Sequence, residues 1–206
     1  SAQPFLGFVF TSSTHAPWMI PDARFQKFKG PTPKDTFLNS LVYADWALGQ
    51  LIDAAKKAGY FENTIFVLVA DHADSFIEQA ENVPNLYHIP LLIVGPGIQA
   101  GLDDRIGSQF DILPTLIDLG GWKTSFAGMG HSLLDPISAR NGASFGVRGD
   151  AFDWIDSAGW ISHNLDKRLD QSPGLAEADA LRMQQNLLAT YQVMSTLQSR
   201  NGFKPS

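Results

Sequence analysis

The chain carries short continuous apolar runs, separated by segments in which apolar residues recur with helical spacing. The apolar runs predict buried strands over residues 5–10, 64–70 and 90–94. Helical spacing begins after Thr32 and places the apolar side chains on one face. Continuous apolar strands that alternate with helices are typical of sheets covered on both sides. The pattern therefore predicts an α/β fold with a mainly parallel sheet and helices on both faces.

The helix predicted after Thr32 has recognisable signals at both ends. Thr32 can cap the first turn, Pro33 fits the first helical position, and Asp35 is an acid three residues after the cap. Gly59 supplies a stop at the other end. These signals fix the expected bounds of the longest N-terminal element.

The second half of the chain predicts smaller elements. Residues 111–121 predict a short helix, in which Asp111 can order the start, Pro114 fits the first turn and two glycines form the stop. The segments 143–149 and 151–162 predict edge strands or a hairpin. A small antiparallel C-terminal element is therefore expected beside the main sheet.

A last helix is predicted over residues 181–197 and is closed by Asn201 and Gly202. The sequence shows no internal repeat, no low-complexity tract and no clear domain boundary. We therefore expect residues 1–206 to form a single α/β domain.

Composition limits the function classes. The chain has 206 residues, of which 44% are hydrophobic and 17% are charged, enough to bury a sizeable core. The net charge of −6 and the lack of any Lys/Arg run argue against nucleic acid as a partner. The absence of cysteine excludes disulfides and thiolate chemistry. No apolar run approaches the roughly 20 residues of a membrane span.

Two polar clusters follow predicted strands: "TSSTH" ends at His15, and "DHADS" begins with Asp71 and His72. Ligands of parallel α/β sheets bind beyond the carboxyl ends of the strands, so we expect these three side chains on one rim. A carboxylate beside an imidazole suits Zn²⁺ or Mn²⁺, although two ligands alone do not hold a metal. A pair of surface or capping residues is the alternative interpretation of Asp71 and His72.

Five longer motifs follow one another in a distinctive order. They are "THAPW", "YADWALGQLIDAAKKAGYFENTIFVLVADHADS", "HIPLLIVGPG", "SQFDILPTLIDLGG" and "GMGHSLL". Over residues 5–135 this order resembles the alkaline phosphatase superfamily. The resemblance is to its sulfatase-like branch, which includes lipoteichoic acid synthases and phosphoethanolamine transferases. It implies a partial alkaline-phosphatase-like fold and an enzyme that hydrolyses or transfers phosphate or sulfate esters.

The resemblance also implies roles for individual residues. Asp71 and His72 match the pair that binds the catalytic metal, with Mn²⁺ or Zn²⁺ expected and Ca²⁺ or Mg²⁺ as alternatives. His15 matches the histidine that contacts the phosphate or sulfate group of the substrate. His88 lies near a further substrate-binding histidine of phosphoethanolamine transferases, and a structural role is the alternative.

Nothing in the chain matches the family's nucleophile, which is a Thr, a Ser or a formylglycine. We therefore expect the C-terminal portion of a sulfatase-like catalytic domain, inactive by itself, with the nucleophile not in the chain. The resemblance further implies a parent that is membrane-anchored through its N-terminal part, with this domain outside the cytoplasm (periplasmic or at the cell surface). The expected substrate is a phosphate or sulfate ester, linked to a lipid or a glycan.

Two other function classes compete with this interpretation. "GASFG" matches the nucleophile motif of serine hydrolases, with Ser144 followed by Asp156 and His163 in a triad order. The flanking segments do not predict the required strand before and helix after Ser144, and the span to His163 is short for a triad. A non-catalytic binding domain is the third class.

Overall fold

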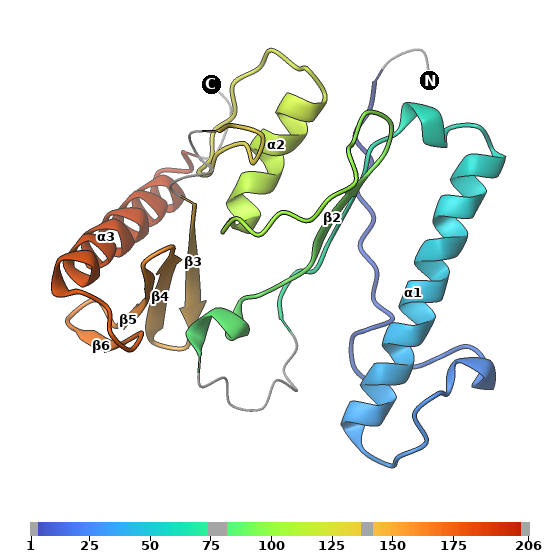
Figure 1. Cartoon of the computed structure of the whole chain (residues 1–206), viewed down its shortest axis with the longest axis horizontal. Coiled ribbons are helices and arrows are strands. Elements are labelled where there is room, and N and C mark those ends of the chain that lie inside the picture. The colour runs from blue at the N-terminus through green and yellow to red at the C-terminus, as the bar shows by residue number, and fades with distance from the viewer. Residues whose placement is uncertain (1–3, 74–81, 137–141, 203–206) are drawn as a thin grey trace. The chain divides into compact units, whose positions relative to one another are not determined.

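The computed structural model of the chain describes residues 4–73, 82–136 and 142–202 (Figure 1). The chain divides into two compact units, each of which is described by itself. The first comprises Ser1–Ala70 and Pro90–Gln99, and the second comprises Asp71–Ile89 and Ala100–Ser206. The expectation that residues 1–206 form one domain stays a prediction.

The first unit contains one long helix, two short 3-10 helices and a two-stranded sheet. In chain order these are η1 (Ala23–Phe25), α1 (Pro33–Lys57), η2 (Phe61–Asn63), β1 (Phe66–Val69) and β2 (Leu91–Val94).

Helix α1 begins and ends where the sequence predicts. The Thr32 hydroxyl accepts a hydrogen bond from the Asp35 amide, and the Asp35 carboxylate accepts one from the Thr32 amide, which completes a capping box. Pro33 occupies the first turn. At the other end Gly59 adopts a φ of 77°, the left-handed conformation that stops a helix.

The prediction of a mainly parallel sheet is wrong for β1 and β2. Phe66 pairs with Val94 and Val69 pairs with Leu91, so the two strands are antiparallel. The backbone amide of Ala70 also lies 3.4 Å from the carbonyl of Pro90. This contact joins the two ends of the segment between β1 and β2. The two strands are also less buried than predicted, since Val69, Leu91 and Leu92 are exposed. A continuous apolar run is typical of buried parallel strands but does not determine strand direction, and this caused the error.

The predicted strand at residues 5–10 is also not formed. This segment has no regular secondary structure, and its large side chains are exposed, Phe8 by 87% and Val9 by 81%. A strand needs a neighbour to accept and donate its backbone hydrogen bonds. Within residues 4–73, 82–136 and 142–202, none of the strands pairs with this segment.

The second unit contains a four-stranded sheet, a long helix and three shorter helices. These are η3 (Val83–Leu86), η4 (Gln109–Asp111), α2 (Ile112–Leu119), β3 (Ala143–Arg148), β4 (Ala151–Asp156), β5 (Gly159–His163), β6 (Arg168–Gln171) and α3 (Glu177–Ser199). The strands pair in chain order, and every pair is antiparallel. The predicted antiparallel C-terminal element and terminal helix are therefore confirmed, while β6 was not anticipated.

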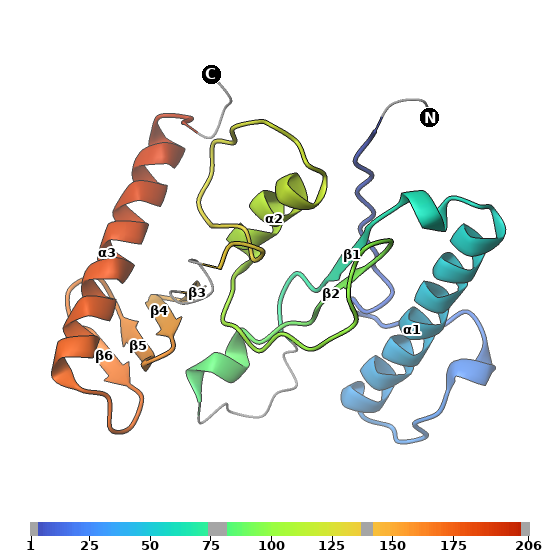
Figure 2. The same ribbon diagram turned by 45° about the horizontal axis from the view of Figure 1, so that its top comes forward.

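The four-stranded sheet is covered on both faces. Ile161 faces α3 and packs with Met183 and Leu187, consistent with the course of α3 beside the sheet in Figures 1 and 2. Ile155 and Trp160, whose side chains point to the opposite face, pack with Val83 of η3. Additional members of the α3 cluster are Ala180, Phe145, Phe152, Trp154, Leu175 and Leu188.

Among the helices that the structure describes, none combines the length and the apolar character needed to cross a membrane.

Candidate functional site

Asp71 and His72 leave the end of β1 and turn their side chains toward each other. The amide of His72 donates to Oδ1 of Asp71 at 3.0 Å, and Nδ1 of His72 lies 2.8 Å from the carbonyl of Ala73. A carbonyl only accepts, so Nδ1 must carry the proton in the neutral ring. The Nε2 lone pair of His72 is then available to a metal, with its orientation held by a backbone carbonyl.

The spacing of this pair fits one cation. Nε2 of His72 lies 3.8 Å from Oδ2 of Asp71, and the side chains are 76% and 61% exposed respectively. An ion about 2.0–2.2 Å from each donor can span that distance. The donor set of one carboxylate and one imidazole therefore fits the expected divalent metal.

The part of the chain that is described contains no cluster of three or more His, Cys, Asp or Glu that could hold a metal. Asp74 and Ser75, which also belong to the "DHADS" motif, lie outside the described residues. Asp71 and His72 thus supply two ligands, where a catalytic zinc site commonly takes three from the protein.

Gln109 anchors this pair, and sequence reasoning did not single it out. Its side-chain amide donates to the carbonyl of Asp71 at 2.8 Å. Gln109 is the first residue of η4, so the backbone of the ligand pair is tied to the start of the α2 segment. The only sequence signal was its position inside the motif "SQFDILPTLIDLGG".

Asp111 holds the same region together from inside. It is buried, and its carboxylate accepts hydrogen bonds from the amide of Ser108 at 2.7 Å and the amide of His131 at 2.8 Å. A capping role at this helix start was predicted, and the bond to His131 adds a link to the "GMGHSLL" loop. Gly130 makes the approach feasible, because its φ is 99° and a Cβ there would lie 2.2 Å from the carbonyl oxygen of Phe110.

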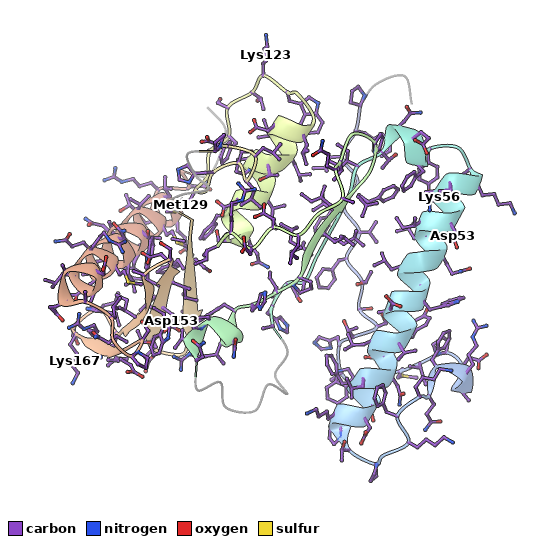
Figure 3. All side chains as sticks on the ribbon, in the orientation of Figure 1. Asp53, Lys56, Lys123, Met129, Asp153 and Lys167 are labelled. Carbon is purple, nitrogen blue, oxygen red and sulfur yellow. The ribbon has the colours of Figure 1, made fainter. Side chains whose placement is uncertain are left out.

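An apolar pocket of about 250 Å³ lies beside Gln109. It is lined by Gln109, Phe110, Leu113, Phe126, Gly128, Met129 and Met194. Figure 3 labels Met129 in the loop that follows α2. Gln109 therefore touches both the carbonyl of Asp71 and a space suited to an apolar group.

His15 belongs to the first unit and sits in a tight turn. Its amide donates to the carbonyl of Ser12 at 3.0 Å, and its Nδ1 lies 2.8 Å from the carbonyl of Ala16; the residue is exposed. The ring of Trp18, shortly after it, packs edge-on against Phe37 of α1 at 6.4 Å between centroids. The expected proximity of His15 to Asp71 and His72 stays a prediction.

His88 belongs to the second unit and is exposed. It follows η3 and lies directly after Tyr87, whose ring and hydroxyl are held by the four-stranded sheet. Its assignment to substrate binding stays a prediction.

The geometry of the C-terminal sheet argues against a serine hydrolase. Ser144 lies inside β3, without a strand-to-helix turn. The register aligns Ser144 with Trp160 through Ile155, and aligns His163 with Val147 through Phe152. Ser144 and His163 are thus two strands and three residues apart, on the order of 10 Å in each direction.

Asp156, the acid of that triad, forms hydrogen bonds with other residues. Oδ2 of Asp156 accepts from Nη1 of Arg182 at 2.7 Å, and its Oδ1 accepts from the amide of Ala158 at 2.9 Å. Nδ1 of His163 accepts from the amide of Leu165 at 2.8 Å. None of these contacts joins Ser144, Asp156 and His163 to one another.

Comparison with known proteins places four of the five motifs in one family. The sulfatase family model matches residues 1–122. The chain is 27% identical over 163 residues to lipoteichoic acid synthase 1 of Bacillus subtilis, which covers 68% of this chain and 25% of that protein. It is 33% identical over 100 residues to arylsulfatase K of Danio rerio, with 46% and 19% covered, and 31% identical over 112 residues to endo-4-O-sulfatase of Bacteroides thetaiotaomicron, with 51% and 21% covered.

A solved structure shows that the fold is similar as well. A protein of the alkaline phosphatase superfamily from Vibrio parahaemolyticus superposes with a TM-score of 0.77 at 28% identity, over 96% of this chain and 50% of that one. The predicted alkaline-phosphatase-like fold is confirmed. The chain spans about a quarter or less of the length of these curated relatives.

Proposed function

Because this chain belongs to the sulfatase family, we propose that it forms part of a metal-dependent active site that hydrolyses or transfers phosphate or sulfate esters. The observation that carries the proposal is the pairing of Asp71 with His72. Their donor atoms lie 3.8 Å apart and exposed, with the imidazole proton held on Nδ1 by the carbonyl of Ala73. In the described part of the chain, Nε2 of His72 and Oδ2 of Asp71 contact only each other, so both can turn to a shared cation.

In this proposal Asp71 and His72 hold a divalent metal, Mn²⁺ or Zn²⁺ in the first place and Ca²⁺ or Mg²⁺ otherwise. Such an ion would take charge from a transferring phosphoryl or sulfuryl oxygen when bound. Gln109 fixes the backbone of Asp71, and the Ala73 carbonyl fixes the ring of His72. Two ligands do not suffice, so the proposal requires further acidic ligands and a nucleophile in addition to Asp71 and His72.

His15 would meet the phosphate or sulfate group, and His88 would contact the remainder of the substrate. Both residues are exposed, and the ring of His15 uses Nδ1 for the carbonyl of Ala16, which leaves Nε2 for a substrate. The resemblance to lipoteichoic acid synthase 1 supports a lipid- or glycan-linked substrate and an extracytoplasmic, membrane-anchored parent.

A metal titration of the chain tests the ligand assignment. Binding of Mn²⁺ or Zn²⁺ should be weak, with a Kd above about 1 µM, because Asp71 and His72 supply two ligands where three or four are usual. Asp71→Ala should remove the binding, whereas Asp53→Ala, on the exposed face of α1 (Figure 3), should preserve it. Binding that survives Asp71→Ala would reject the metal site.

The full-length protein tests the division of roles. Asp71→Ala should lose both metal and turnover of phosphate or sulfate esters. His15→Ala should retain the metal and lose about 10²- to 10³-fold in kcat, the usual cost of one electrostatic donor at a transition state. Metal loss in His15→Ala would make His15 a ligand, and full activity would reduce it to a turn residue.

A further inference from the structure

The chain segment between β1 and β2 begins with Asp71 and His72 and ends with η3 and His88. The C-terminal end of this segment is partly buried. Val83 of η3 is buried against Ile155 and Trp160 of the four-stranded sheet. The end of the segment is therefore packed on a sheet that lies beyond the residues matched by the family model.

A buried carboxylate strengthens this packing. Asp153 of β4 is fully buried, and its Oδ2 accepts a hydrogen bond from the hydroxyl of Tyr87 at 2.5 Å. Its Oδ1 accepts from the hydroxyl of Ser162, and Nε of Arg148 lies 3.4 Å from Oδ2. A buried charge is costly unless both oxygens find donors, and here Tyr87 is one of the donors that the fold supplies.

The ring of Tyr87 lies against bare backbone. A Cβ at Gly146 of β3 would stand 2.3 Å from Cε1 and 2.4 Å from Cζ of Tyr87, so the ring can occupy its place only because residue 146 is a glycine. Gly146 pairs with Asp153 in the register of β3 and β4. The cradle of Tyr87 thus consists of a glycine and a carboxylate side by side on adjacent strands (Figure 3 labels Asp153).

We infer that Asp153 and Gly146 are positioning residues for the active site: they fix Tyr87, and through it the placement of His88. Because Tyr87 and His88 are adjacent, a fixed Tyr87 fixes the backbone from which the imidazole of His88 extends. The functional part of this inference rests on the proposed role of His88 in substrate binding. The inference assigns the four-stranded sheet a role in positioning a substrate-binding residue. Neither the sequence motifs nor the family match assigns that role to the sheet.

Nuclear magnetic resonance of the chain tests the positioning directly. Gly146→Ala, which displaces the ring of Tyr87, should shift the imidazole signals of His88. It should also speed amide exchange at Asn85 and Tyr87, whose amides donate to the carbonyls of Asn82 and Pro84. Gly49→Ala is the matched control, because a Cβ on α1 at that position meets nothing within 4 Å. Unchanged His88 signals in folded Gly146→Ala would overturn the inference.

A milder variant keeps the test decisive if Gly146→Ala does not fold. Tyr87→Phe removes only the hydroxyl that Asp153 accepts, and exchange of the Tyr87 amide should rise about tenfold, the order expected for one lost hydrogen bond to a charged group. Tyr60→Phe makes the same change on an exposed tyrosine of the first unit and should leave His88 unaffected. Equal exchange in Tyr87→Phe and the unmodified chain would also overturn the inference.

Kinetics of the full-length protein separate positioning from simple support of the fold. Tyr87→Phe should raise KM about tenfold, measured well below the melting temperature of the variant, while metal content changes little, because the loss concerns how substrate is held. An unchanged KM would reduce the cradle to a structural anchor. Failure of the proposed function would show differently, as metal retained in Asp71→Ala, and would leave the resonance experiments on His88 as they stand.

Discussion

The side-chain amide of Gln109 donates a hydrogen bond of 2.8 Å to the backbone carbonyl of Asp71. This contact joins a residue of η4 to the first of the two candidate metal ligands across 38 positions of sequence. Groups that orient a ligand from outside the coordination shell commonly matter nearly as much as the ligands themselves. Gln109 is therefore the most informative residue for testing how the ligand pair is held.

Gln109→Ala should weaken metal binding by about 10-fold, because Asp71 loses its fixed backbone while both ligand side chains remain. Broadening of water and His72 resonances by added Mn²⁺ measures this affinity even when it is weak. Gln50→Ala, on an exposed position of α1, serves as the control. Equal Mn²⁺ affinity in Gln109→Ala and the unmodified chain would show that the contact has no role in the site.

Gly130→Ala should destabilise the second unit by about 2 kcal/mol or more, since the new Cβ both requires a strained φ and meets the Phe110 carbonyl. Gly121→Ala isolates the first effect, because Gly121 has a φ of 63° but open space around its Cβ position, and should cost about 1 kcal/mol. Denaturant unfolding of both variants provides the comparison. Similar losses of unfolding free energy in the two variants would mean that the loop around His131 shifts to make room for the added methyl group.

The apolar pocket beside Gln109 predicts a preference among ester substrates of the full-length protein. Met129→Lys should raise KM about tenfold for an ester that carries a long alkyl chain, as expected when about two buried methylene groups lose their apolar contact. KM for glycerol phosphate should change little. Met19→Lys, at a 76% exposed position, is the control. Parallel changes for both esters would show that the pocket does not receive the substrate.

The sequence predicted those parts of the fold that depend on local chemistry. Thr32 and Asp35 form the expected capping box, and Gly59 stops α1, because caps and stops are decided within one turn. The directions of β1 and β2 could not be predicted in the same way. Their apolar runs are compatible with either direction, and the antiparallel pairing appears only in the register of Phe66 with Val94 and Val69 with Leu91.

In the candidate site, too, local contacts could be predicted from the sequence and long-range contacts could not. Asp71 and His72 are adjacent in the sequence, so their pairing could be anticipated from "DHADS" alone. The contact between Tyr87 and Asp153 spans 66 positions, and nothing in the sequence near either residue indicates the other. Such long-range contacts become visible only when the register of β3 and β4 is known.

His163 should make the stability of the chain depend on pH. Burial lowers the pKa of His163 below its ordinary value, and the nearby Arg168 acts in the same direction while Asp166 opposes it. The unfolded state then binds a proton more readily than the folded state. The stabilisation is therefore fully present above the ordinary histidine pKa and is lost as the pH falls toward the lowered one.

Unfolding of His163→Asn as a function of pH checks this expectation. An Asn side chain can still accept from the amide of Leu165, as Nδ1 of His163 does, but it does not titrate. Between about pH 7 and about pH 5 the unmodified chain should lose more unfolding free energy than the variant. If the unfolding free energy of His163→Asn depends on pH as strongly as that of the unmodified chain, the pH dependence arises from other groups.

The tautomer of His72 is the sharpest consequence of the geometry at the ligand pair. Nδ1 of His72 faces the carbonyl of Ala73 at 2.8 Å, so the neutral ring should carry its proton on Nδ1 and expose a lone pair on Nε2. Nitrogen-15 chemical shifts above about pH 7 distinguish the two ring nitrogens. His131, whose side chain is exposed, provides a reference for a histidine ring in solvent.

Addition of Zn²⁺ should then move the Nε2 resonance of His72 and leave its Nδ1 proton in place, because the metal and the Ala73 carbonyl use opposite sides of the ring. Asp71→Ala should suppress the shift, since one imidazole alone binds zinc weakly. A His72 ring found mainly in the other tautomer, or zinc attached at Nδ1, would mean that the contact with Ala73 does not orient a ligand. Asp71 and His72 would then be a turn at the end of β1, and the metal site would have to be sought elsewhere.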